Sequence, residues 1–190
     1  MKSAQPITKF VAYLKNEIRK KLRQHTYRIQ LTADTCDICC CELKALLEEN
    51  SQQFNEQANS LKLELALEFF KSVIQLKALL PASCEALNLY ALDIASLLCQ
   101  ITTAISQNDE EQPKVEAFAQ ILKLAQNKST QPDERYSLLE AALPLLTKDN
   151  AAELHYQVEA LSKKVPATGE YIAKHILLTE QLQEKLKDLE

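Results

Sequence analysis

Glycine is nearly absent from this chain, since Gly169 is the only glycine among 190 residues. Dinucleotide-binding fingerprints, phosphate-binding P-loops and nucleophile elbows each need several glycines, where the backbone approaches a phosphate or turns sharply. These three kinds of site are therefore excluded. Tight turns between strands also depend on glycine, and the sequence contains no convincing run of alternating β-branched residues. The shortage of glycine thus favours an all-α fold.

The sequence also lacks the residue patterns of helical metal enzymes. Its three histidines are scattered, and neither Glu-x-x-His nor His-Glu-x-x-His occurs. Without these patterns, neither a di-iron bundle nor a zinc-protease helix is predicted. No nucleophile has a base near it in the sequence, and His175, on an apolar face, is interpreted as a hydrogen-bonded core residue. We expect no catalytic residue, no metal and no cofactor, and we do not expect an enzyme.

One stretch, residues 82–107, is far more apolar than the rest of the chain. At the ~100° per residue of an α-helix, its large apolar residues share one broad face and its polar residues form a narrow seam. The face comprises Leu87, Tyr90, Ala91, Ile94, Leu97, Leu98, Ile101 and Ile105, and the seam comprises Asp93, Ser96, Gln100, Thr103 and Gln107. Such a helix is typical of the centre of a bundle, with other helices on three sides. Asn88, Asp93 and Gln100 interrupt the roughly 18 apolar residues of a membrane span, so we do not expect one.

Apolar residues make up 46% of the chain, which is enough to bury a core without disulfides or a metal. Helical periodicity predicts a compact bundle of seven or eight helices, with the shorter ones in the C-terminal half. The segment 34–80 would overshoot a compact domain as one helix, so Asn50 is the predicted break, and one long helix with a protruding end is the alternative. Thr130 and Asp133 form a predicted capping box, and Pro144 is expected to end the helix that follows.

Domain organisation is expected to be simple. Residues 1–190 are expected to form one all-α domain, with a division into two lobes, 1–107 and 113–190, as the alternative. The polar, acidic connector 106–113 is the predicted boundary between such lobes.

Charge is distributed unevenly along the chain. Residues 1–31 carry eight Lys or Arg and one acid, for a net charge of +7, whereas the remainder carries −11, which together give −4. The basic residues belong to a predicted amphipathic helix, 6–30, whose apolar stripe includes Phe10, Val11, Leu14, Ile18 and Leu22. Its predicted partner-binding residues are Lys9, Lys15, Arg19, Lys20 and Arg23. An acidic protein is the expected partner. Anionic lipid remains an alternative, and nucleic acid is disfavoured because few aromatic side chains accompany the charges.

Cysteines cluster at positions 36, 39, 40 and 41. A zinc site needs four ligands, and no second close pair of Cys or His follows the Cys36-x-x-Cys39 pair. We expect Cys36, Cys39 and Cys40 to be buried as small apolar residues and Cys41 to be exposed as a reactive thiol. Acylation of this cluster is an open alternative. The polar N-terminus does not fit a signal peptide, so we expect reduced thiols and a cytoplasmic protein.

The last eleven residues, Glu180 to Glu190, read EQLQEKLKDLE. This tail resembles the glutamate-rich signals of type IV secretion effectors of intracellular bacteria. The resemblance implies delivery into a host cell and carries no implication for the fold.

Three functions follow from these observations, in order of preference. The first is a non-enzymatic helical protein–protein interaction module, which includes a secreted effector or adaptor. The second is a peripheral binder of anionic membrane or nucleic acid through the basic helix 6–30. The third is a small helical enzyme that depends on a metal or on the cysteine cluster. The identity of the partner and the oligomeric state do not follow from the sequence.

Overall fold

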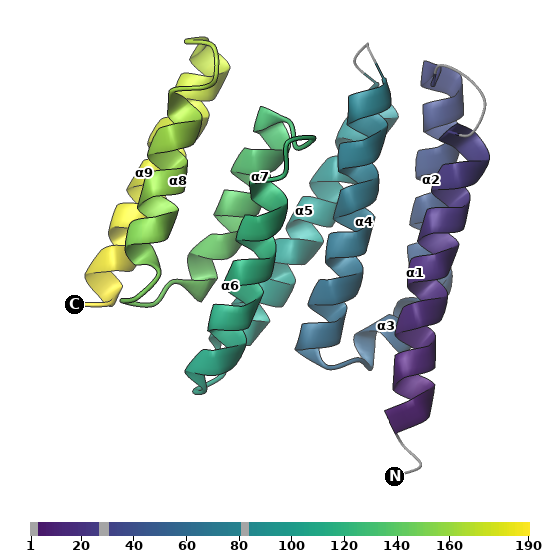
Figure 1. The fold of residues 1–190 in the computed structure, drawn as a ribbon, viewed down its shortest axis with the longest axis horizontal. Coiled ribbons are helices and arrows are strands. Elements are labelled where there is room, and N and C mark those ends of the chain that lie inside the picture. Colours follow the sequence, from purple (N-terminus) through teal and green to yellow (C-terminus); the bar gives the residue numbers. More distant parts are fainter. Residues whose placement is uncertain (1–3, 27–30, 81–83) are drawn as a thin grey trace. The chain divides into compact units, whose positions relative to one another are not determined.

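The computed structural model describes residues 4–26, 31–80 and 84–190 (Figure 1). These residues form nine α-helices and one 3₁₀ helix and contain no strand, which confirms the all-α class. The helices exceed the expected seven or eight because residues 33–79 divide into three of them. They are α1 (Ala4–Thr26), α2 (Ala33–Glu49), α3 (Ser51–Asn55), α4 (Asn59–Leu79), α5 (Glu85–Ser106), α6 (Glu111–Ala125), α7 (Pro132–Ala142), η1 (Leu143–Leu145), α8 (Ala151–Ser162) and α9 (Gly169–Asp188).

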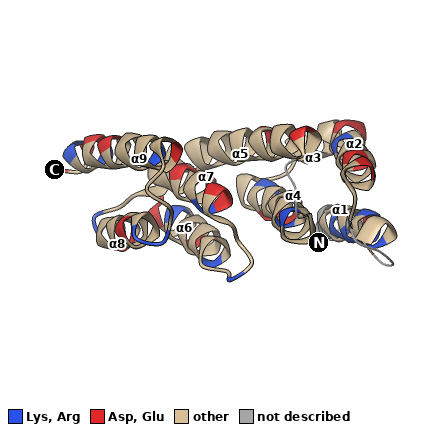
Figure 2. Cartoon of the chain, turned by 90° about the horizontal axis from the view of Figure 1, so that it is seen from above, with Lys and Arg blue, Asp and Glu red and all other residues tan. Residues whose placement is uncertain are grey.

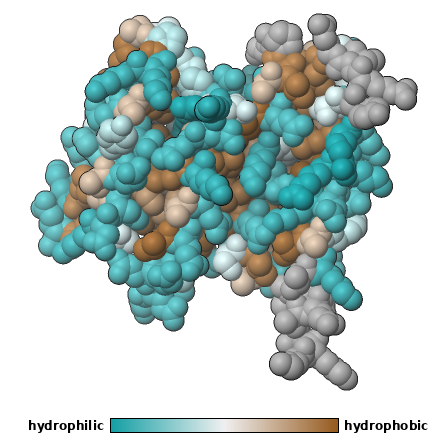
Figure 3. Space-filling model, viewed as in Figure 1, coloured by the Kyte–Doolittle hydropathy of each residue, from teal (hydrophilic) through white to brown (hydrophobic). Residues whose placement is uncertain are grey.

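The chain divides into two compact units, residues 1–98 and 99–190. The division falls within α5, whereas the sequence places the boundary between lobes in the connector 106–113. The first unit contains α1 to α4 and the beginning of α5. The end of α5, residues 99–106, belongs to the second unit with α6 to α9. In the view of Figure 3, hydrophilic side chains cover the helices and hydrophobic side chains show between them.

In the first unit, α1 packs against α2 and α4, and α2 contacts α3. Local capping sets the start of α2, because the Thr32 side chain accepts a hydrogen bond from the Thr35 backbone N–H at 3.2 Å. The predicted break at Asn50 is confirmed, since α2 ends at Glu49 and the Asn50 side chain donates to the Leu46 carbonyl at 2.8 Å. The basic helix runs from Ala4 to Thr26, and the rest of the predicted segment, 27–30, lies outside the described residues.

Helix α5 buries the face that the sequence predicts. Leu87, Tyr90 and Ile94 are buried, and all five residues of the polar seam are exposed. The Tyr90 hydroxyl lies 2.9 Å from the Ser72 hydroxyl of α4 inside the core of the first unit. Burial on three sides, however, is wrong, because Leu89 and Leu92 on the outer face are 50% and 65% exposed. The start of the predicted segment at residue 82 and its proposed cap lie outside the described residues.

Helix α5 is also the one helix in the described part of the chain with the length and composition to cross a membrane. Only 33% of its most apolar 18-residue window is buried. Core helices of soluble proteins pass the same test, so this finding is weak support for a membrane span. The exposed Asp93 on its outer face forms an ion pair with Lys44 of α2 at 3.2 Å.

The second unit contains two successive helical hairpins, α6–α7 and α8–α9. Helix α7 contacts α6, α8 and α9, and η1 packs against α6, α7 and α9. Pro144 lies in η1, directly after the end of α7, as predicted. The predicted capping box is wrong, because Gln131 is the N-cap of α7 and makes no side-chain capping bond. The buried Thr130 hydroxyl instead donates to the Leu124 carbonyl at 2.8 Å, which satisfies a carbonyl at the end of α6.

Candidate interaction surface

The basic helix α1 is held in place by its apolar stripe. Phe10, Val11, Leu14, Ile18 and Leu22 are all buried, as the sequence predicts, against α2 and α4. Because these residues recur at three- and four-residue spacings, they fix which side of α1 faces the core. Figure 2 shows Lys and Arg residues on the ribbon of α1.

Two of the five predicted partner-binding residues are paired within the first unit. Lys15 forms an ion pair with Glu64 of α4, and the Arg19 Nε donates to the Glu68 carboxylate at 2.8 Å. The Glu68 side chain is only 8% exposed, and Lys71 lies 3.6 Å from its other oxygen. The hydrogen bond and the negative charge of Glu68 raise the pKa of Arg19 above its ordinary value. Lys15 and Arg19 therefore attach α1 to α4.

The other three predicted residues, Lys9, Lys20 and Arg23, are exposed. No ion pair involves them among the residues that the structure describes. At ~100° per residue they lie on one face of α1, together with Asn16 and the half-exposed Tyr13. We call these five residues, Lys9, Tyr13, Asn16, Lys20 and Arg23, the outer strip. The five predicted partner-binding residues therefore fall into two groups. Lys15 and Arg19, which we call the inner pair, contact α4. Lys9, Lys20 and Arg23 belong to the outer strip.

The end of α1 makes one further charged contact. His25 Nε2 lies 2.8 Å from a carboxylate oxygen of Glu42 in α2. Among the described residues, no group of three or more His, Cys, Asp or Glu is arranged to hold a metal ion. The contact therefore links α1 to α2 and offers no ligand set.

The cysteine cluster belongs to α2 in the first unit. Cys36, Cys39 and Cys40 are buried and Cys41 is exposed, as the sequence predicts. The neighbouring Cys40 thiol, together with burial, raises the pKa of Cys36, and Cys84 is buried as well. Burial also raises the pKa of Cys39 to about 12. A thiol that stays protonated at neutral pH is a poor nucleophile. The reactivity of Cys41 stays a prediction.

His175 is partly buried rather than fully inside the core. Its Nε2 lies 3.8 Å from a Glu159 oxygen, and its Nδ1 is buried without a hydrogen-bond partner in the described structure. No nucleophile is placed beside it by a hydrogen bond among the described residues. The contact joins α9 to α8.

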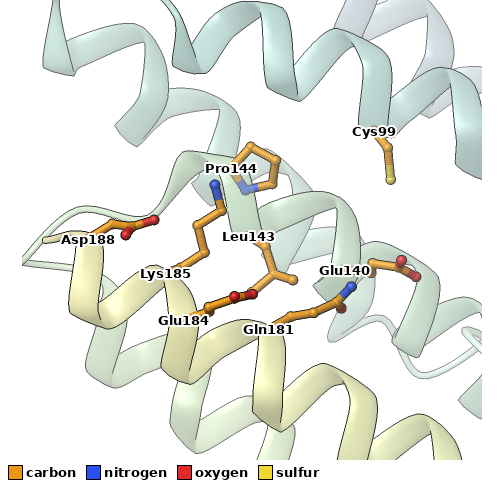
Figure 4. Close-up of a pocket in the computed structure, with 8 residues that line it drawn as sticks. All are labelled: Cys99, Glu140, Leu143, Pro144, Gln181, Glu184, Lys185 and Asp188. Carbon is orange, nitrogen blue, oxygen red and sulfur yellow. The ribbon is translucent and has the colours of Figure 1, made fainter.

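The second unit contains a concavity of about 420 Å³ that sequence reasoning did not find (Figure 4). Its lining comes from α5, α7, η1 and α9, and comprises Cys99, Glu140, Leu143, Pro144, Gln181, Glu184, Lys185 and Asp188. Burial, and secondarily the charge of Glu140, raise the pKa of Cys99 to about 11, so its thiol is protonated at neutral pH. No spacing in the sequence indicates such a site, because its residues come from four separate elements.

No protein-family model, curated protein or solved structure matches this chain. The surfaces of the chain itself offer two candidates for function. Of these, the outer strip of α1 combines exposed charge of one sign with a rigidly attached helix. The concavity of the second unit combines three carboxylates with one lysine and a protonated thiol.

Proposed function

We propose that this chain is a non-enzymatic helical interaction module that binds an acidic protein partner through the outer strip of α1. The observation that supports the proposal is the division of the basic residues on α1. Lys15 and Arg19 are paired with α4, whereas Lys9, Lys20 and Arg23 are exposed and have no ion pair in the described structure. The inner pair fixes the orientation of the helix. The outer strip then presents three cations at fixed positions along about 21 Å of helix from Lys9 to Arg23.

The composition of the strip favours a protein over the other anionic ligands. Binding to a membrane by an amphipathic helix requires insertion of its apolar face. The apolar stripe of α1 is buried against α2 and α4, so only its charges face outward. Single-stranded nucleic acid is bound through several stacked aromatic side chains, and Tyr13 is the one aromatic residue of the strip. Three cations and a tyrosine instead match a helix or peptide that carries several carboxylates.

The expected affinity is modest and depends on salt. An exposed ion pair contributes about 0.2–1 kcal/mol. Three such pairs give a weak complex whose association is accelerated by the field of the strip and slowed by added salt. This behaviour is typical of a reversible interaction module.

The test compares two charge-matched variants. The strip variant carries Lys9→Gln, Lys20→Gln and Arg23→Gln. The control carries Lys123→Gln, Lys128→Gln and Lys148→Gln, which are also exposed and belong to the second unit. Three fluorescent probes are used, namely a glutamate-rich helical peptide, vesicles containing phosphatidylserine and a single-stranded oligonucleotide. Fluorescence anisotropy reports binding of the peptide and the oligonucleotide, and co-sedimentation reports binding of the vesicles.

We expect the parent and the control to bind the acidic peptide, with an affinity that falls as salt rises, and the strip variant to lose this binding. Equal binding by the strip variant and the control contradicts the proposal. Preferential binding of vesicles or oligonucleotide by the parent, lost in the strip variant, supports the peripheral-binder alternative instead.

Delivery into a host cell stays a prediction from the resemblance of Glu180–Glu190 to secretion signals. These residues lie at the end of α9, where Glu180, Glu184 and Glu190 are exposed. Their exposure leaves the tail accessible to a receptor. A translocation assay with the tail removed is the corresponding measurement.

A further inference from the structure

Helix α9 has a second apolar surface besides the one that it buries. Its buried residues are Leu178 and Leu182. Ile172, Ile176 and Leu177 are 50%, 51% and 54% exposed. At ~100° per residue, these three and the exposed Ala173 lie on the opposite side of the helix from the buried pair. We call Ile172, Ala173, Ile176 and Leu177 the outward patch of α9.

The orientation of α9 is fixed by several contacts on its inner side. The Lys174 ammonium donates to Asp133 of α7 at 2.9 Å and lies 3.3 Å from Glu170. The ring of Tyr171 stacks on that of Tyr136 of α7, with 6.1 Å between ring centroids. Because the contacts with Asp133 and Tyr136 fix the helix on α7, it cannot turn the outward patch into the unit.

The outward patch is more than scattered surface apolarity. A single exposed aliphatic side chain is normal, whereas contiguous exposed apolar residues mark interaction sites. Residues at i, i+3 and i+4 are neighbours on a helix surface. Ile172 and Ile176, Ala173 and Leu177, and Ala173 and Ile176 are such pairs, so the four residues form one continuous patch. This is the arrangement by which one helix packs on another.

Charge on the same face indicates the partner. The exposed Glu180 and Glu184 follow the outward patch on the next two turns, and Lys187 is the one cation beside them on that face. A matching helix therefore carries aliphatic residues opposite the patch and Lys or Arg opposite Glu180 and Glu184. A second copy of α9 fits poorly. Antiparallel pairing of two patches about Ile176 sets Glu180 of each copy opposite Ile172 of the other and supplies no Lys or Arg for this carboxylate.

We propose that the outward patch of α9, with Glu180 and Glu184, binds a basic amphipathic helix of a partner protein. This surface belongs to the second unit and is independent of the outer strip of α1. The acidic partner proposed for α1 and the basic helix proposed for α9 have opposite chemistry. The chain is then an adaptor with two docking surfaces of different specificity.

The test uses a fluorescent 14-residue peptide of leucine and lysine arranged so that leucine occupies one helical face. A scrambled peptide of the same composition lacks that face, and a leucine–glutamate peptide retains it with opposite charge. The patch variant carries Ile176→Ser and Leu177→Ser. The apolar control carries Leu89→Ser and Leu92→Ser, which are exposed to a similar degree on α5. The contribution of the two acidic residues is tested by the double variant Glu180→Gln with Glu184→Gln. Its control is the double variant Glu48→Gln with Glu49→Gln on α2.

We expect the parent to bind the leucine–lysine peptide better than the scrambled or the acidic peptide. The patch variant is expected to lose about tenfold in affinity, since two half-exposed aliphatic side chains no longer contribute their burial. The Glu180 and Glu184 variant is expected to lose less affinity, and chiefly at low salt. Both controls are expected to bind like the parent.

Three results overturn the proposal. They are equal binding of the helical and scrambled peptides, equal losses in the patch variant and the α5 control, and a dimer of the parent that the patch variant abolishes. Circular dichroism of each variant establishes that it folds. Because the outer strip of α1 is unchanged in all of them, failure here leaves the test of the proposed function intact.

Discussion

Replacement of Arg19 by glutamine separates the structural cations of α1 from those proposed to bind a partner. Arg19 donates to the nearly buried Glu68 carboxylate at 2.8 Å, while Arg23 is exposed on the same helix without an ion pair in the described structure. Arg19→Gln and Arg23→Gln are the same chemical change four residues apart. Any difference in stability between them therefore comes from the contact with α4.

The expected loss of unfolding free energy in Arg19→Gln follows from the contacts of Glu68 with Arg19 and Lys71. A hydrogen bond to a charged group contributes about 1.5–3 kcal/mol to stability. The Arg19 side chain is 54% exposed, so solvent screens its charge, and Lys71 lies 3.6 Å from the same carboxylate of Glu68 and compensates part of the loss. We therefore expect Arg19→Gln to lower the free energy of unfolding by about 1–2 kcal/mol. Arg23→Gln is expected to change it by less than about 0.5 kcal/mol, as at an ordinary surface position.

Urea unfolding followed by circular dichroism at the helical band measures both variants. Glu68→Gln alone and the double variant Arg19→Gln with Glu68→Gln complete a thermodynamic cycle, from which the coupling free energy of the pair is obtained. The reasoning is refuted if Arg19→Gln and Arg23→Gln shift the unfolding midpoint equally, or if the cycle gives no coupling. In either case α1 is not held to α4 by this pair, and Arg19 returns to the set of candidate partner-binding residues.

Two further predictions concern the cysteines and the end of α6. Native protein treated with a thiol reagent at pH 8 should be modified at Cys41 well before Cys36 or Cys39, because burial raises the pKa of Cys39 to about 12 and keeps its thiol protonated. Mass spectrometry of the digested protein gives the order of modification. Equal rates at these cysteines contradict the prediction. Thr130→Asp removes the hydroxyl that donates to the Leu124 carbonyl and buries a carboxylate, so it should destabilise the second unit by about 2 kcal/mol or more. If Thr130 were instead the N-cap of α7, aspartate would be tolerated in thermal unfolding, since aspartate is a preferred capping residue.

Much of the fold is determined by the sequence alone, because local rules decide it. The scarcity of glycine and the helical periodicity gave the all-α class. The spacing of Phe10, Leu14 and Ile18 predicts the buried stripe of α1, and the same periodicity predicts the polar seam of α5. The breaks at Asn50 and before Pro144 follow from side-chain capping and from the missing backbone N–H of proline. Each of these features depends on residues within a few turns of one another.

The candidate sites depend on contacts between distant parts of the chain. Lys15 and Arg19 pair with residues 49 positions away, so no local pattern distinguishes them from Lys20 and Arg23. Thr130 satisfies the helix before it rather than the helix after it, although its spacing to Asp133 fits a capping box. A helical wheel identifies which residues share a face, and the neighbouring helices decide which faces are covered. For that reason the exposure of Leu89 and Leu92, and the outward patch of α9, were decided only by the tertiary structure.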